Sequence, residues 1–171
     1  MRRLSGVAQD QLSGNSMRYK QQARALVGEG TDSSGPAPLE VNVLFTDRRA
    51  TRVALRAATG LATDLNATIR VRAVVAVPFA LPLDHPQVSI PFTEEVLSGL
   101  VSEFEQNSLD ITAHLYLSRN RIEAFLQILQ PNSLVVIAGR KRPWPTAESR
   151  IAIKLQSEGH RVVFIPFRRG D

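Results

Sequence analysis

Two apolar segments decide the fold of this sequence: VNVLFT at residues 41–46 and LVVIA at residues 134–138. Both are short and rich in β-branched side chains, as strands buried on both faces of a parallel sheet are. Three further strands are expected at residues 68–77, 109–117 and 162–165. The chain therefore contains five predicted strands, each ending near a turn or breaker signal.

Helical segments separate these strands. Their apolar residues recur about every fourth position, and each has a recognisable start or end signal. Thr93 and Asn120 are the expected N-caps of the second and third helices, and Gly159 is expected to close the fourth. The four predicted helices begin and end near residues 50–66, 93–104, 121–130 and 146–158.

Strict alternation of strand and helix favours one architecture. Short connections between alternating elements require right-handed crossovers, which place the helices on both faces of a mainly parallel sheet. The sequence therefore predicts a three-layer α/β/α sandwich with a five-stranded sheet. We expect this domain to cover residues 40–171, behind a flexible leader at residues 1–39 that holds five of the ten glycines and a short helical stretch from Met17 to Val27.

Composition excludes several classes of protein. The absence of cysteine excludes a disulfide scaffold, a cysteine-ligated metal site and a thiol nucleophile. The net charge of +5 is diffuse and is weak support for a nucleic-acid partner, so none is expected. Residues 73–83 form the longest nearly apolar run and are too few to span a membrane. With no secretion signal either, we expect a cytoplasmic protein that is not membrane-embedded.

A ligand site is expected where the predicted strands end. In open parallel sheets, ligands bind beyond the carboxyl ends of the strands, at the point where the strand order reverses. If the first and fourth strands are neighbours, five basic side chains and one carboxylate converge there and would attract an anion. The candidate ligand-binding residues in these two loops are Thr46, Asp47, Arg48, Gly139, Arg140, Lys141 and Arg142.

The order of elements and the ends of the first and fourth strands resemble the universal stress protein family over about residues 40–166. The resemblance implies the sheet order 3-2-1-4-5, which makes those two strands neighbours. It also implies that Asp47 contacts a nucleotide ribose and base, and that the backbone of Val74 contacts adenine. A homodimer through the fifth strand is implied as well, and the RVVFI segment at residues 161–165 would present an apolar edge.

The nucleotide motif of that family is not matched. ATP-binding members carry Gly-x2-Gly-x9-Gly-(Ser/Thr) after the fourth strand, because glycines let backbone N–H groups approach phosphates. Gly139 matches the first position, but Arg142 stands at the second, and Ala152 with Ile153 at the last two. We therefore expect no ATP binding in the family's usual manner and no cofactor.

Several residues near this loop keep two interpretations. The basic run from Arg140 to Arg142 is either a solvated turn or an anion site built from point charges. Asp47 is either a nucleotide contact or a helix cap or salt-bridge partner. Trp144, which lies between two prolines, is either a lid or a packing anchor, and we favour the anchor.

No catalytic signature is present, and His85, His114 and His160 have no metal-ligand spacing. The sequence therefore predicts a non-catalytic universal stress protein-like domain with a degenerate nucleotide site that acts in regulation or interaction, with a protein partner. The alternative is a binding protein for a nucleotide or another phosphorylated small molecule. In that case the ligand would lie in the basic crevice at the first and fourth strands.

Overall fold

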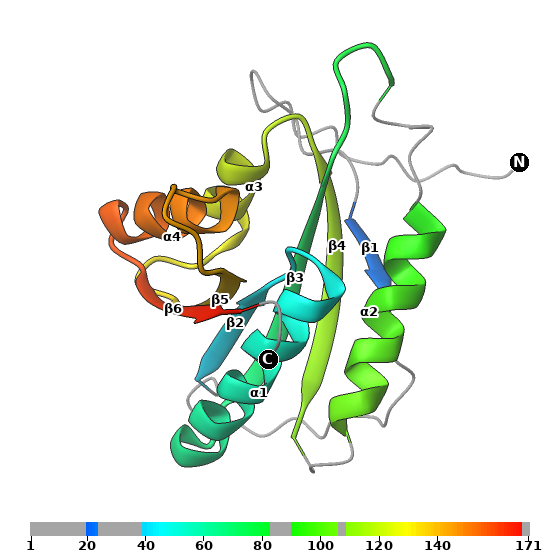
Figure 1. The fold of residues 1–171 in the computed structure, drawn as a ribbon. Helices are drawn as coiled ribbons and strands as arrows, with labels where there is room; N and C mark the ends of the chain where they lie inside the picture. The colour runs from blue at the N-terminus through cyan, green and yellow to red at the C-terminus, as the bar shows by residue number, and fades with distance from the viewer. Residues whose placement is uncertain (1–19, 24–38, 83–89, 106–108, 169–171) are drawn as a thin grey trace, which may run out of the picture.

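The computed structural model describes residues 20–23, 39–82, 90–105 and 109–168. Within these ranges the chain forms a six-stranded sheet in the order β1-β4-β3-β2-β5-β6 (Figure 1). Five of the strands are parallel, and the predicted order 3-2-1-4-5 is confirmed by the run β4-β3-β2-β5-β6. These strands are β2 (Glu40–Leu44), β3 (Thr68–Ala76), β4 (Ile111–Ser118), β5 (Leu134–Arg140) and β6 (Arg161–Phe167).

The sixth strand, β1 (Lys20–Ala23), comes from the segment expected to be a leader. It pairs antiparallel with β4, with Lys20 opposite Tyr116 and Ala23 opposite Ala113. The prediction of a short helix from Met17 to Val27 is wrong at these four residues, because the edge of β4 offers unpaired backbone groups that a strand satisfies. The rest of the predicted leader, apart from Leu39, lies outside the described residues.

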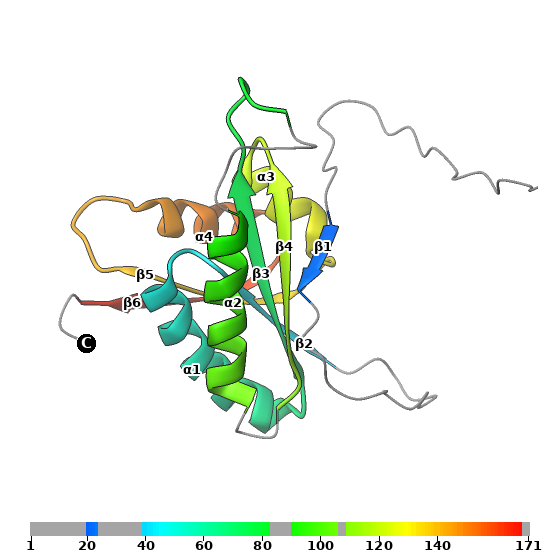
Figure 2. The same cartoon turned by 90° about the vertical axis from the view of Figure 1, so that its right-hand side faces the viewer.

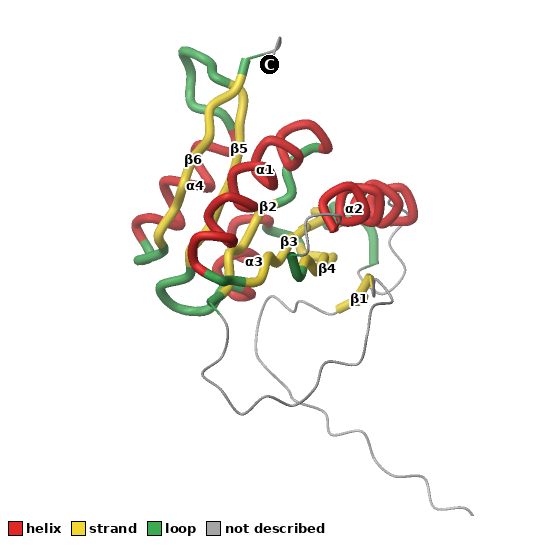
Figure 3. Tube along the Cα trace, turned by 90° about the horizontal axis from the view of Figure 1, so that it is seen from below, coloured by secondary structure: helices red, strands yellow, loops and turns green. Residues whose placement is uncertain are grey.

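Helices cover both faces of the sheet (Figures 2 and 3). The helices α1 (Arg48–Leu65) and α2 (Ile90–Glu105) pack on one face, and α3 (Arg121–Ile128) and α4 (Ala147–Ser157) on the other. The buried face of α1 is largely alanine, which allows its backbone to lie close to the sheet. The fully or almost fully buried alanines are Ala50, Ala54, Ala58 and Ala62.

The predicted helix ends are confirmed in part. The Asn120 side chain caps α3 by accepting from the N–H groups of Ile122 and Glu123, and Gly159 follows α4 with a φ of 89°. The prediction that Thr93 caps the second helix is wrong, because α2 already begins at Ile90. Pro91 supports that earlier start, since proline is favoured in the first turn of a helix.

The third helix also ends earlier than expected, at Ile128 instead of Gln130. Leu129 is already extended, with φ −84° and ψ 137°. A residue before proline avoids helical backbone angles, and Gln130 precedes Pro131. The helix therefore ends before the position that Pro131 restricts.

Gly139, near the end of β5, lies directly beneath α4. A Cβ atom added to Gly139 would lie 2.9 Å from Cβ of Glu148 and 3.0 Å from Cζ of Phe164. Glycine is therefore required here by the close approach of the helix to the strand.

We expect the Gly139→Ala substitution to lower the free energy of unfolding by about 1–3 kcal/mol, because overpacking displaces α4. Urea denaturation measures this change. Gly60→Ala is the matched control, because nothing lies within 4 Å of a Cβ at this position in α1. That control is expected to raise stability by about 0.5–1 kcal/mol. Equal effects of the two substitutions would contradict the steric role of Gly139.

Candidate functional site

The candidate site lies at the carboxyl edge of the parallel sheet, where β2 and β5 are neighbours. The chain leaves β2 toward α1 on one face and leaves β5 toward α4 on the other, so this is the point where ligands bind in such sheets. A cavity of about 400 Å³ opens here. It is lined by Asp47 from the end of the β2 region and by residues of the β5–α4 connection: Arg140, Arg142, Trp144, Pro145, Thr146, Ala147 and Glu148.

Three of the eight predicted site residues line this cavity: Asp47, Arg140 and Arg142. Lys141 lines an adjoining cavity that also contains Arg140 and Arg142, and its N–H donates to the carbonyl of Phe167 at 2.9 Å. The other four residues, Thr46, Arg48, Val74 and Gly139, are not part of either lining.

Each of those four has a different position. Val74 is buried in the core beneath α3 and α4, whereas Arg48 is exposed at the first position of α1. The Oγ1 atom of Thr46 is buried without a hydrogen-bond partner in the described structure. Gly139 is covered by Glu148 of α4 and by Phe164, as described above. The strand ends thus meet as predicted, but only part of the candidate set faces the cavity.

Asp47 acts as the N-cap of α1. Its Oδ1 atom accepts from the N–H of Ala50 at 2.9 Å, and its carbonyl accepts from the N–H and the Oγ1 of Thr51 at 2.9 and 2.7 Å. This observation agrees with the helix-cap interpretation, although the carboxylate also borders the cavity. The cap holds the carboxylate at the start of α1, so its position follows from local structure.

Arg121 is a residue at this edge that the sequence reasoning missed. From the first position of α3, its Nη2 atom donates to the carbonyl of Phe45, just beyond β2, and its guanidinium lies 5.9 Å from the ring centroid of Phe125. Burial lowers the pKa of Arg121, and the carboxylate of Glu148 partly opposes that shift. One feature of the sequence could have identified Arg121. It comes directly after Asn120, the N-cap that follows a parallel strand.

The charges that line the cavity balance. Arg140 and Arg142 contribute two positive charges, and Asp47 and Glu148 contribute two negative ones. Trp144 is 79% exposed, so the expectation that it anchors the loop by packing is wrong. The chain bends at Pro143 and Trp144, and the exposed indole lines the cavity.

The positions of the family's last two motif residues lie inside a helix. The cap of α4 is Thr146, whose Oγ1 accepts from the N–H of Ser149 at 3.2 Å. Ala152 and Ile153 follow within α4, with Ala152 buried and Ile153 exposed. A glycine-rich loop that brings backbone N–H groups to a phosphate would have to precede a helix N-terminus. These two residues come after it.

Among the described residues, no group of histidine, aspartate and glutamate side chains could hold a metal ion. The described helices also include none that is long and apolar enough to cross a membrane.

Solved structures with a similar arrangement include universal stress proteins. One from Archaeoglobus fulgidus matches with a TM-score of 0.56 at 17% identity, covering 74% of this chain and 93% of the other. A member of the family from Burkholderia pseudomallei matches with a TM-score of 0.53 at 18% identity, over 78% and 98%. The chain has the universal stress protein fold. No protein-family model and no curated protein sequence matches it.

The likeness at this level of identity concerns the universal stress protein fold and not the ligand. It places the cavity between the ends of β2 and β5 at the switch point of a known architecture. The chemistry of the cavity must be argued from this chain's own side chains.

The role of Asp47 can be tested by stability. We expect Asp47→Ala to lower the free energy of unfolding by about 1 kcal/mol, because the Ala50 N–H loses its acceptor. Asp47→Ser keeps a capping oxygen without the charge and should retain most of the stability. Thermal denaturation of both variants measures the difference. A stability of the alanine variant equal to that of the native chain would exclude the cap as the main role of Asp47.

Proposed function

We propose that this chain is a non-catalytic regulatory or interaction domain of universal stress protein type, with a degenerate nucleotide site. The observation that carries the proposal is the N-cap of α4 at Thr146, which leaves Ala152 and Ile153 inside the helix. The connection between Arg140 and Ala147 is too short for the nine-residue spacing of the family's motif. The glycine that remains, Gly139, is needed for packing.

The groups at the strand ends support the same proposal. The guanidinium of Arg121 already donates to the carbonyl of Phe45, two residues before Asp47. The two carboxylates at the cavity, Asp47 and Glu148, would also repel phosphate groups. On this proposal the domain acts through contacts with proteins and is cytoplasmic.

A homodimer through β6 belongs to this proposal. β6 lies at one edge of the described sheet, and Val162, Phe164 and Ile165 along it are only partly buried. Val163 is 37% exposed. An edge strand with apolar side chains is a surface on which a second copy can pair.

A second function is favoured by one observation: the exposed Trp144 lies at a cavity that also contains Arg140 and Arg142. An indole offers a stacking surface and two guanidinium groups offer forked donors to a phosphate. This combination suits a nucleotide or another phosphorylated small molecule held without a glycine loop.

The first testable consequence uses Trp144, which is the only tryptophan of the chain. We expect its fluorescence to show no saturable change when ATP, AMP or inorganic phosphate is added to about 1 mM, a range that detects even weak binding. A saturable change that disappears in the Arg140→Ala/Arg142→Ala variant would replace the degenerate-site proposal by the second function. The Arg150→Ala variant, on the exposed side of α4, is the control.

The second consequence concerns the dimer. We expect the native chain to sediment as a dimer at micromolar concentration and the Val163→Lys variant to sediment as a monomer, because a lysine on an edge strand opposes pairing. Leu65→Lys introduces the same charge at an exposed leucine of α1 and should leave the dimer intact. A monomeric native chain would rule out the β6 dimer.

A further inference from the structure

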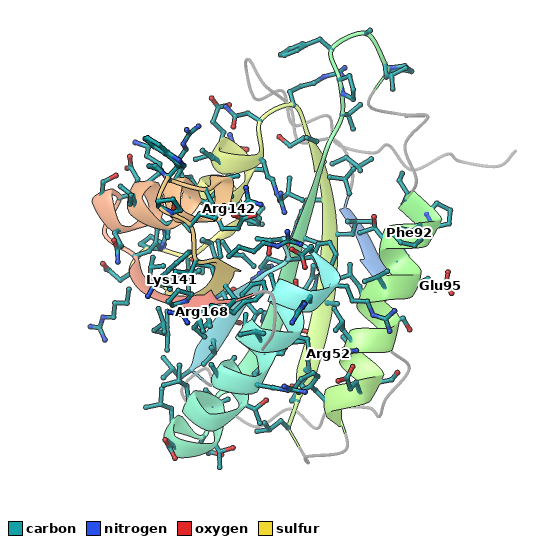
Figure 4. All side chains as sticks on the ribbon, viewed as in Figure 1. Arg52, Phe92, Glu95, Lys141, Arg142 and Arg168 are labelled. Atoms are coloured by element: carbon teal, nitrogen blue, oxygen red, sulfur yellow. The ribbon has the colours of Figure 1, made fainter. Side chains whose placement is uncertain are left out.

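A strongly basic groove adjoins the cavity described above and shares Arg140 and Arg142 with it. One part, of about 590 Å³, is lined by Arg49, Arg52 and Arg56 of α1 with Val53 and Phe167 among their neighbours. The other part, of about 670 Å³, is lined by Arg140, Lys141, Arg142 and Arg168, again with Phe167. Phe167 borders both parts, and no acidic residue of the described chain is in either lining. We call these two parts the basic groove; Arg52, Lys141 and Arg168 are labelled in Figure 4.

The three arginines of α1 form a row. Their spacing of three and four residues places Arg49, Arg52 and Arg56 on one side of the helix. With a rise of 1.5 Å per residue, the row is about 10 Å long. Alternate side chains of an extended peptide are about 6–7 Å apart. The row therefore suits a short extended segment that carries two acidic side chains, and Val53 provides an apolar contact between them.

The row already holds one carboxylate. Nε and Nη2 of Arg52 both donate to Oε2 of Glu103 in α2, at 3.0 and 2.7 Å. The side chains of this pair are 34% and 38% exposed. An exposed pair of this kind contributes at most about 1 kcal/mol, so exchange of Glu103 for a carboxylate of another chain costs little.

The aromatic residue of the groove is not available for stacking on a base. Phe167 is only 4% exposed, and the guanidinium of Arg49 lies 5.9 Å from its ring centroid. The exposed Trp144 lines the other cavity together with Asp47 and Glu148. Proteins that bind single-stranded nucleic acid combine basic grooves with exposed aromatic side chains. The described groove lacks that combination, which favours a protein partner.

We propose that the basic groove binds an acidic peptide segment of a partner protein. Guanidinium groups form forked hydrogen bonds with carboxylates, and arginine is enriched in protein interfaces. The inference rests on the interaction role proposed above and names the chemistry of the partner. Arg140 and Arg142 also line the nucleotide crevice, and Phe167 ends β6. The test is therefore made at Arg56 of α1, which belongs to neither.

Fluorescence anisotropy tests the proposal with the full chain. The probe is a fluorescein-labelled eight-residue peptide of alternating glutamate and leucine, and a peptide with glutamine in place of glutamate is the uncharged comparison. We expect the acidic peptide to bind in low salt and to be released as ionic strength rises. The Arg56→Glu substitution should weaken binding about tenfold, because it reverses one charge of the row.

Arg150→Glu makes the same change at an exposed arginine of α4 and is expected to leave the affinity unchanged. Circular dichroism shows whether the charge reversal disturbs folding. In that case the Arg49→Gln/Arg56→Gln variant replaces Arg56→Glu in the binding experiment, because it removes positive charge without adding a carboxylate. The proposal is overturned if the acidic peptide does not bind, if Arg56→Glu and Arg150→Glu behave alike, or if a thymidine oligonucleotide of equal charge binds as tightly. The Trp144 titration and the sedimentation of the dimer are separate measurements. If the acidic peptide does not bind, those two measurements still test the degenerate nucleotide site and the β6 dimer.

Discussion

The pairing of β2 with both β3 and β5 is the constraint on which the rest of the structure depends. Val43 lies opposite Val71 on one side and opposite Val136 on the other. A strand held on both sides, with its side chains buried on both faces, sets the direction of its neighbours. Since all three strands are parallel, their carboxyl ends meet at one edge, and Asp47 and Arg140 come together there although they are far apart in the chain.

Close helix packing at that edge changes what the edge can bind. Glycine at the end of a parallel strand allows either a phosphate or a helix to approach the backbone closely, because it has no side chain. In this chain Glu148 and Phe164 occupy the space beside Gly139, and the guanidinium of Arg121 reaches the carbonyl of Phe45. The backbone at Gly139 and at Phe45 is therefore already in contact with the protein's own side chains.

The same edge gathers positive charge on its outer side. Residues from α1, from the β5–α4 connection and from the end of β6 line the basic groove. Net charge gave no indication of it, since +5 over the chain is modest. The charge becomes significant through placement, because neither part of the groove is lined by an acidic residue of the described chain. Glu103 pairs with Arg52, and Asp47 and Glu148 line the adjoining cavity.

The sequence by itself determined the five parallel strands, their order through the family resemblance, the N-cap at Asn120 and the glycine that follows α4 at position 159. These features depend on apolar spacing and on capping residues within a few positions of one another, so local patterns carry them. The strand β1, the early start of α2 and the exposure of Trp144 were decided by the tertiary structure. So was the reach of Arg121 to Phe45, because a long side chain finds its partner only after distant elements have packed.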